Sequence, residues 1–189
     1  MKFNGKDIAG PALILCAVCL VITGALSVTN FITRDTISAL SLKTEQEARS
    51  VVLPTAANFQ PADGQGDYTI GIAQDGTVAG YVFTNTAKGY GGTLEVMTGI
   101  STEGNVTGVT ILSLNETPGL GMNAQNETYT DMYRQPVPKN GFSVVKSGQA
   151  EHGNIVALTG ATITTNAVTN AVNAAVEQYQ AIQGGAQNG

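Results

Sequence analysis

The sequence predicts an α+β protein in which one N-terminal transmembrane helix precedes a domain with a mainly antiparallel sheet packed on helices. Three observations support this prediction. Residues 11–33 form an almost charge-free apolar run. Residues 68–114 contain short alternating segments separated by turn residues, which is typical of antiparallel strands. From Val168 to Ile182 the apolar residues recur at steps of three or four, the period of an amphipathic helix.

Composition narrows the possible function classes. The chain has 189 residues, of which only 12% are charged, and a net charge of −5. This acidic balance and the lack of a basic cluster argue against nucleic acid as a partner. His152 is the only histidine in the sequence, so a metal site of several histidines is excluded. Cys16 and Cys19 both lie in the apolar run, so the rest of the chain forms no disulfide and no cysteine cluster.

The apolar run at residues 11–33 is long enough to cross a bilayer core of ~30 Å as a helix. A cleaved signal peptide is the rival interpretation, but the run exceeds the usual ~7–15-residue signal core and ends without a clean cleavage site. We therefore expect an uncleaved signal anchor that passes once through the cell (inner) membrane. Lys2 and Lys6 precede the run, so the positive-inside rule places residues 1–10 in the cytoplasm and the following domain on the extracytoplasmic side.

Cys16 and Cys19 share one face of the predicted membrane helix, because they are three residues apart. Cysteines in such a helix are more often small packing residues than ligands. Metal ligation together with cysteines of another subunit is the alternative. No metal site is predicted within this chain alone.

After the span, residues 34–60 are expected to form a helical connector, with a polar helix over 34–49 that Pro54 stops near Leu53. Residues 61–67 form a turn-rich loop, and the folded domain is expected to occupy residues 61–183. The predicted strands cover residues 68–73, 78–84, 93–100 and 106–114, with a further short strand at 142–146. Residues 184–189 are expected to be a disordered tail.

A small, hydroxyl-rich stretch, residues 158–166, comes just before the amphipathic helix. Thr164, Thr165 and Asn166 are residue types that cap a helix N-terminus, so we expect the helix to begin after them. A helix start offers unpaired N–H groups to an anion such as phosphate, and Gly160 allows a ligand to approach the backbone closely. The alternative is a simple strand–turn–helix joint with capping threonines.

The string Thr159-Gly160-Ala161-Thr162 resembles the flavinylation motif of the FMN-binding domain found in the G subunits of Rnf complexes and the C subunits of the sodium-pumping NADH:quinone oxidoreductase. In that family the last Thr or Ser of the motif carries FMN through a phosphoester bond. The resemblance therefore implies covalent FMN on Thr162. Val156 stands where the family motif usually has Asp.

Two further motifs match the same family. Residues 116–121 read Glu-Thr-Pro-Gly-Leu-Gly, in which Pro-Gly predicts a type II turn, and residues 89–92 read Gly-Tyr-Gly-Gly. The resemblance implies that the flavin is lined by Glu116, Thr117, Gly119 and Leu120. It implies that the phosphate end is surrounded by Thr159, Gly160, Ala161 and Thr164 or Thr165. Lys146 is compatible with a phosphate partner and equally with a solvated surface lysine. Leu114 stands where the family commonly has His.

The function of this family indicates the function expected of the chain. The resemblance implies a membrane-anchored electron carrier in an Rnf-type ferredoxin:NAD oxidoreductase, coupled to Na⁺ or H⁺ translocation and matured by an FAD-dependent flavin transferase. Its partners would be membrane lipid and the other membrane and peripheral subunits. No catalytic residue is predicted, because Thr162 has no histidine close in sequence to activate it. The short chain fits the Rnf member of the family better than the longer quinone-oxidoreductase member. A cofactor-free anchored binding module and a pilin-like structural protein are the remaining alternatives.

Overall fold

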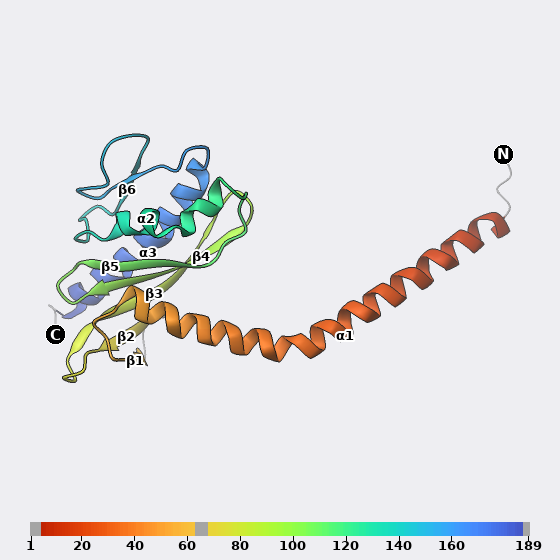
Figure 1. Ribbon diagram of the computed structural model, residues 1–189, viewed down its shortest axis with the longest axis horizontal. Helices are drawn as coiled ribbons and strands as arrows, with labels where there is room; N and C mark the ends of the chain where they lie inside the picture. Colours follow the sequence, from red (N-terminus) through yellow and green to blue (C-terminus); the bar gives the residue numbers. More distant parts are fainter. Residues whose placement is uncertain (1–4, 63–67, 187–189) are drawn as a thin grey trace. The chain divides into compact units, whose positions relative to one another are not determined.

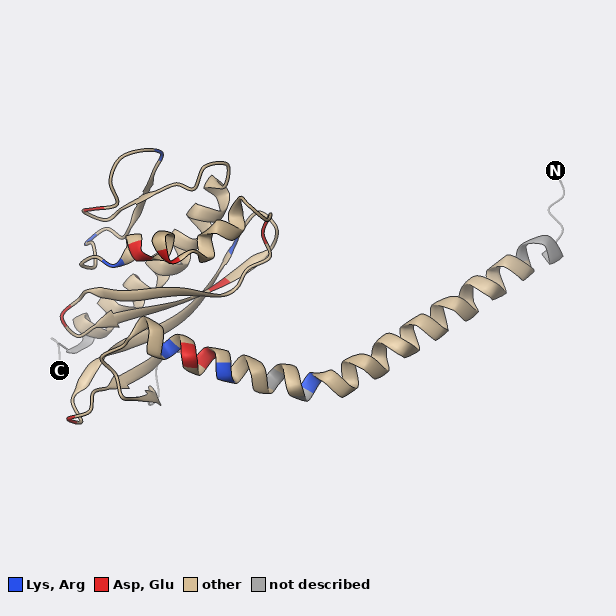
Figure 2. Ribbon diagram, viewed as in Figure 1, with Lys and Arg blue, Asp and Glu red and all other residues tan. Residues whose placement is uncertain are grey.

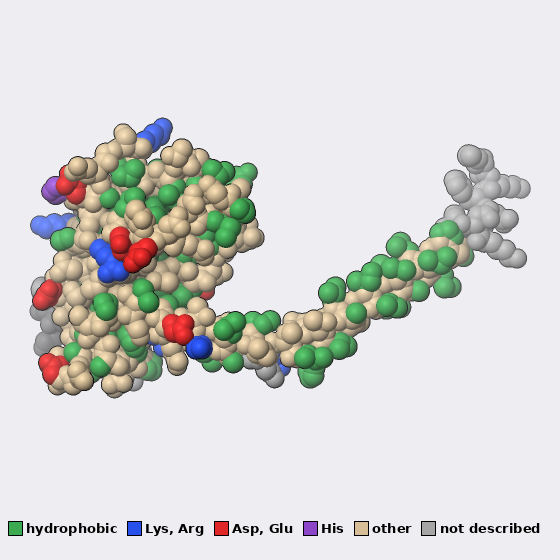
Figure 3. Space-filling view, in the orientation of Figure 1, with side chains coloured by type: hydrophobic (Ala, Val, Ile, Leu, Met, Phe, Trp, Pro, Cys, Tyr) green, Lys and Arg blue, Asp and Glu red, His purple; other side chains and the backbone are tan. Residues whose placement is uncertain are grey.

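The computed structural model describes residues 5–62 and 68–186, and the chain divides into two compact units, Met1–Lys43 and Thr44–Gly189. The first unit is helical. Helix α1 (Gly5–Val52) contains a stretch, Ala9–Arg34, that is long and apolar enough to cross a membrane. Its apolar side chains are exposed along the helix, as Figure 3 shows. The predicted span, 11–33, lies inside this stretch.

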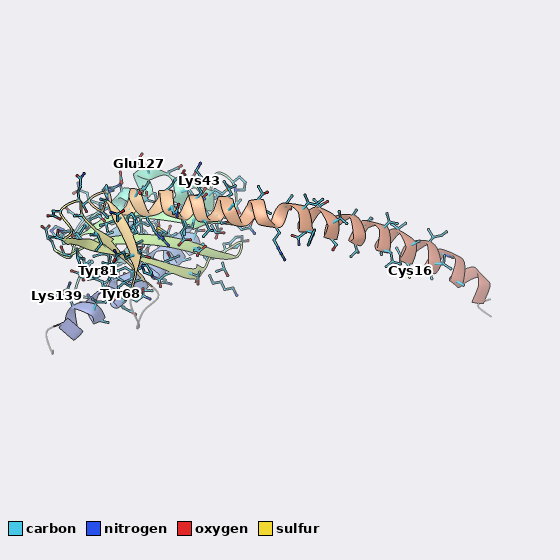
Figure 4. All side chains as sticks on the ribbon, turned by 90° about the horizontal axis from the view of Figure 1, so that it is seen from below. Cys16, Lys43, Tyr68, Tyr81, Glu127 and Lys139 are labelled. Carbon is cyan, nitrogen blue, oxygen red and sulfur yellow. The ribbon has the colours of Figure 1, made fainter. Side chains whose placement is uncertain are left out.

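Within α1 the structure differs from the sequence-based prediction in one respect. The predicted connector helix is not a separate element, because α1 continues without a break from Gly5 to Val52. Hydroxyl groups that interrupt the apolar pattern bond to the preceding turn; for example, Thr33 Oγ1 donates to the carbonyl of Thr29 at 2.9 Å. The helix ends two residues before Pro54, as predicted. Cys16 and Cys19 are both exposed on it, and Figure 4 labels Cys16.

The second unit is built on one five-stranded antiparallel sheet (Figure 1). Its strands follow one another in the order of the chain: β1 (Asn58–Pro61), β2 (Tyr68–Ile72), β3 (Val78–Lys88), β4 (Thr93–Ser101) and β5 (Val106–Ser113). Four of these strands confirm the prediction. The prediction missed β1, so the domain begins before residue 61, and the predicted loop at 61–67 falls largely outside the described residues.

Two layers cover the sheet. Helix α3 (Thr162–Ala186) packs on one face against β3 and β4, where Phe83, Val96 and Ile100 meet Val172 and its neighbours in the main core. An aromatic cluster extends this contact toward the C-terminal half of α3. Its members are Tyr68 and Tyr81, which Figure 4 labels, together with Phe83 and Tyr179.

The last turn of α1 covers part of the other face. Val52 and Leu53 are fully buried there in a second, smaller core with Val82 and Met97. Two strand glycines make this close contact possible. A Cβ on Gly99 would collide with the carbonyl oxygen of Val52, and a Cβ on Gly108 would lie 2.8 Å from the Cα of Val52. This helical turn is therefore part of the domain core.

Between β5 and α3 the chain forms short elements. They are the 3₁₀ turn η1 (Gly121–Gln125), α2 (Glu127–Thr130), the 3₁₀ turn η2 (Asp131–Tyr133), β6 (Ser143–Val145) and β7 (Asn154–Val156). β6 confirms the short strand predicted at 142–146. It pairs in parallel with β7, which the prediction missed together with α2 and the two 3₁₀ turns.

The start of α3 corrects the predicted capping. The helix begins at Thr162, so Thr164, Thr165 and Asn166 lie within its first turns and are not caps. Threonine fits there because its hydroxyl can bond to the carbonyl four residues back: Thr165 Oγ1 donates to Ala161 O at 3.0 Å. At the other end α3 reaches Ala186, so residues 184–186 are helical and not a disordered tail. Residues 187–189 of that predicted tail lie outside the described residues.

Candidate functional site

Two tight turns face each other at the start of α3. In the first, the N–H of Leu120 donates to the carbonyl of Thr117 at 3.2 Å and Gly119 has φ +76°, which confirms the predicted type II turn around Pro118-Gly119. In the second, the N–H of Ala161 donates to Leu158 O at 3.0 Å and Gly160 has φ +75°. A Cβ on Gly160 would lie 3.0 Å from Leu120 Cδ2, so the two turns are in contact.

Gly121 lets these two parts of the chain approach each other. A Cβ at this position would lie 2.8 Å from Glu116 Oε2 and 2.8 Å from Thr164 Oγ1, closer than atoms in contact can come. Any side chain at position 121 would therefore push the turn at 117–120 away from the first turn of α3.

The third motif, the glycine-rich loop at 89–92, is held by Glu116. The carboxylate of Glu116 accepts hydrogen bonds from the N–H of Tyr90 at 2.7 Å and of Gly91 at 3.3 Å. Its side chain is only 9% exposed. A Cβ on Gly91 would collide with the carbonyl oxygen of Asn115, so glycine is needed where the loop crosses this segment. Glu116 thus fixes the loop that carries Tyr90.

Together the three motifs enclose a pocket of about 510 Å³, a size typical of small-molecule sites. Its walls are formed by Tyr90, Glu116, Thr117, Leu120, Gly121, Gly160, Ala161, Thr162, Ile163 and Thr164. Large apolar side chains surround its mouth: Tyr90 is 73% exposed, Ile163 55% and Leu120 43%. Residues 157–176 carry no charge. Most of the ribbon in Figure 2 is tan, the colour of residues other than Lys, Arg, Asp and Glu.

Exposure separates the four threonines of residues 158–166. Thr162 is exposed and lines the pocket. Thr164 also lines it but is only 1% exposed, and Thr165 is fully buried. The hydroxyl of Thr165 accepts the N–H of Leu158 at 3.1 Å and donates to Ala161 O, so it closes the second turn from behind. Thr159 is exposed but outside the pocket wall.

The backbone at the start of α3 adds hydrogen-bond donors. The first N–H groups of a helix have no acceptor within the helix. In the described part of the chain, those of Thr162, Ile163 and Thr164 donate to no other group, whereas the N–H of Thr165 donates to Ala161 O. Three free donors and the positive end of the helix dipole therefore lie at the first turn of α3, which Thr162 begins.

Seven of the eleven sequence-predicted site residues line the pocket. Gly119 shapes the first turn without lining it, and Lys146 is exposed just after β6, outside the wall. Val156 lies in β7 and Leu114 just after β5, so neither lines the pocket. Three lining residues, Tyr90, Gly121 and Ile163, were not predicted, although the motifs that contain or adjoin them were recognised. Among the described residues, no group of three or more His, Cys, Asp or Glu side chains could hold a metal ion.

Comparison with protein families agrees with this geometry. A family model described as the FMN-binding domain matches residues 89–177, which include every residue of the pocket wall. The region that contains the pocket therefore matches an FMN-binding domain. A second model, the RnfG N-terminal region, matches residues 1–52.

Relatives extend the match over nearly the full length. The G subunit of the Na⁺-translocating ferredoxin:NAD⁺ oxidoreductase complex of Acetobacterium woodii is 38% identical, over 95% of each chain. The G subunit of the proton-translocating complex of Clostridium ljungdahlii is 32% identical, over 90% of this chain and 91% of its own. The crystal structure of Shewanella oneidensis NqrC covers 62% of this chain and 64% of its own, with 16% identity and a TM-score of 0.49. The chain belongs to the RnfG family, the G subunits of Rnf complexes.

The residues of the pocket fit FMN. Thr162 is exposed and begins α3, whose first N–H groups are free donors that suit a phosphate. Gly160 allows a close approach to the backbone, and the apolar side chains of Tyr90, Leu120 and Ile163 suit a planar aromatic ring. The pocket wall contains one acidic residue, Glu116, whose carboxylate already accepts the N–H groups of Tyr90 and Gly91.

Proposed function

We propose that this chain is a membrane-anchored electron carrier that holds FMN covalently on Thr162 within an Rnf-type complex. The single observation that carries the proposal is the position of Thr162. Of the four threonines in residues 158–166, it alone is both exposed and part of the pocket wall. Its relatives are named as subunits of ion-translocating ferredoxin:NAD⁺ oxidoreductases, which supports the electron-carrying role.

The attachment would be a phosphoryl transfer from FAD, made by an FAD-dependent flavin transferase. The Thr162 oxygen bonds to the phosphorus of the FMN half, the bond between the two phosphates of FAD breaks, AMP leaves, and the hydroxyl proton is released. No electron is transferred in this step. The phosphodiester so formed keeps one negative charge, which the free N–H groups at the start of α3 stabilise. Thr162 is thus a tether and takes no part in catalysis.

The domain's own residues would then position the flavin. When bound, FMN supplies the redox chemistry of the carrier. Glu116 keeps the glycine-rich loop and Tyr90 at one side of the pocket. Gly119 shapes the turn that carries Thr117 and Leu120. The roles expected of Thr159 and Lys146 at the phosphate end stay predictions, because both residues lie outside the pocket wall.

The apolar helix suggests how the carrier is held. Residues 11–33, within the apolar stretch Ala9–Arg34, would cross the cell (inner) membrane once and contact lipid, with residues 1–10 in the cytoplasm and the flavin domain on the extracytoplasmic side. A covalent tether would keep the flavin on a domain that has no access to the cytoplasmic cofactor pool. The neighbouring redox partners are the other subunits of the complex.

Flavin fluorescence in a denaturing gel, combined with the intact mass, tests the proposal. The full chain is produced in a host with the flavin transferase, as wild type, Thr162→Ala and Thr102→Ala. We expect fluorescent bands, heavier by FMN less one water, for wild type and Thr102→Ala, and a dark Thr162→Ala band. Thr102→Ala is the matched control because Thr102 is an exposed threonine in the turn between β4 and β5, outside the motif and outside the pocket wall. A dark wild-type band would refute covalent attachment. A native protein without any flavin would favour the cofactor-free binding module.

A further inference from the structure

A chain of buried hydroxyl groups runs behind the pocket. Tyr129 and Tyr133, at 2% and 0% exposed, come from α2 and η2, and their hydroxyl oxygens are 3.1 Å apart. The hydroxyl of Tyr133 lies 2.7 Å from that of Thr169 in α3. Thr169 Oγ1 lies 2.9 Å from the carbonyl oxygen of Thr165. None of these groups lines the pocket.

The direction of each hydrogen bond follows from the fact that a hydroxyl has one proton. Thr169 gives its proton to a carbonyl oxygen, which can only accept. Tyr133 must therefore donate to Thr169, and Tyr129 must donate to Tyr133. Burial raises the pKa of Tyr129 above its ordinary value of 10.0 and that of Tyr133 well above it, so both phenols stay protonated and keep donating at neutral pH.

This chain of bonds connects the two walls of the pocket. Tyr129 and Tyr133 lie on α2 and η2, which follow the turn at 117–120 after the intervening 3₁₀ turn η1. Thr165, at the other end, closes the turn at 158–161 through its hydroxyl. The bonds therefore fix the segment behind one motif against the helix behind the other.

The hydroxyl groups of Tyr129 and Tyr133 matter for the geometry of their hydrogen bonds more than for filling space in the core. Phenylalanine would fill nearly the same volume at both tyrosine positions, and the rings of Tyr133 and Phe142 already pack edge to face at 5.4 Å. Phenylalanine would lack the hydroxyl, so it would interrupt the series of hydrogen bonds that ends at the carbonyl oxygen of Thr165. Hydrogen bonds hold groups at a defined distance and angle, whereas apolar contacts tolerate sliding.

We propose that Tyr129, Tyr133 and Thr169 are positioning residues for covalent flavin attachment. Their hydroxyl chain sets the separation of the two pocket walls and thereby the position of the Thr162 hydroxyl. This inference rests on the proposed attachment of FMN to Thr162. A small displacement of a reacting group can slow a reaction by ~100-fold, so losing one link should slow flavin incorporation by about tenfold or more.

Five variants of the full chain test the inference: Tyr133→Phe, Thr169→Val, the double variant of these two, Thr169→Ser and Tyr179→Phe. The initial rate of flavin incorporation is measured with the transferase and FAD, as kcat and KM. We expect lower kcat with little change in KM for Tyr133→Phe and Thr169→Val. The double variant should be no slower than the slower single variant, because both remove the same chain. Thr169→Ser keeps the hydroxyl and should incorporate flavin at the wild-type rate.

Tyr179→Phe is the matched control for loss of a phenol. Tyr179 is 6% exposed and lies on the same helix, but its hydroxyl bonds to Thr102 O and Gln183, away from the pocket. Its incorporation rate should stay at the wild-type value. Wild-type rates in both Tyr133→Phe and Thr169→Val would overturn the inference, as would equal slowing in Tyr179→Phe. If Tyr133→Phe does not fold, judged by circular dichroism, the contrast between Thr169→Val and Thr169→Ser decides.

Hydrogen exchange separates this inference from the proposed function. It is measured on protein made without the transferase, so it does not depend on flavin. We expect the amides of Leu158 and Thr165 to exchange faster in Thr169→Val than in wild type or Thr169→Ser. If wild type takes up no flavin on Thr162, the proposed function fails. Unchanged exchange at Leu158 would then overturn the inference as well.

Discussion

Replacing Gly121 with alanine should damage the pocket more than the fold. The added Cβ would lie 2.8 Å from Glu116 Cβ, Glu116 Oε2 and Thr164 Oγ1. Carbon atoms in contact normally stay ~3.5–4.0 Å apart, so the groups around position 121 must move by roughly 0.5–1 Å. Both side chains that would have to yield are buried, and Glu116 is also held by the N–H of Tyr90.

The size of the effect follows from this crowding. Overpacking of this kind costs about 1–3 kcal/mol, and 1 kcal/mol lowers the Tm of a domain of this size by roughly 2–4 °C. Gly76→Ala is the matched control. It has φ +84° in the β2–β3 turn and no atom within 4 Å of its Cβ, so it introduces backbone strain of about 1–2 kcal/mol without crowding.

Thermal unfolding followed by circular dichroism, and flavin incorporation by in-gel fluorescence, are measured on both variants. We expect both to lower the Tm, but only Gly121→Ala to lower flavin incorporation severalfold. If Gly121→Ala unfolds at the wild-type temperature and takes up flavin normally, the close approach of the two motifs at this glycine does not control the pocket.

Three further predictions concern stability, each measured by thermal or denaturant unfolding. Glu116→Ala removes a carboxylate that accepts two backbone N–H groups, so it should lower the free energy of unfolding by about 1.5–3 kcal/mol and make the loop around Tyr90 more susceptible to proteolysis. A loss below about 0.5 kcal/mol in a denaturant titration, which is the scatter of neutral surface substitutions, would contradict this prediction. Thr98→Val should stabilise the domain by about 1 kcal/mol, because Thr98 Oγ1 is buried without a hydrogen-bond partner among the described residues; a lower Tm would show that a partner exists. Burial raises the pKa of Tyr129 and Tyr133 above 10.0, so the stability they contribute should be constant below pH 10 and fall as the pH rises above it. Tyr133→Phe should weaken this alkaline loss, and an unchanged pH profile would refute the assignment.

Much of the site could be predicted because its motifs depend on local backbone geometry. Pro118-Gly119 specifies a type II turn in any context, and Gly119 indeed has φ +76°. The other two motifs, at residues 89–92 and 159–162, were assigned to the same site because they resemble motifs of the same family. What local geometry does not reveal is which side chains turn inward. Glu116 lines the pocket as expected, but one of its carboxylate oxygens is bonded to the backbone of the glycine-rich loop. Thr165 was expected beside the phosphate, but it is fully buried and its hydroxyl bonds to the backbone of the turn at 158–161.

The missed elements share a different cause. β1 has only four residues and ends in Pro61, so it shows no alternation, and a proline is tolerated there because β1 is an edge strand. α2 and η2 are too short to show a helical period. The start of α3 was placed too late because threonine is a frequent cap, whereas here Thr165 and Thr169 bond back to carbonyls within the helix or just before it.

The contact between the end of α1 and the glycines of β4 and β5 matters for anyone who wants a soluble fragment of this protein. The flavin domain does not begin where the apolar stretch ends, nor at β1. A fragment that starts at Asn58 would lose Val52 and Leu53, which are both fully buried, and would leave Val82 and Met97 exposed to water on an uncovered sheet face. Such a fragment should aggregate. A fragment that starts at or before Thr44 retains the turn that closes this face.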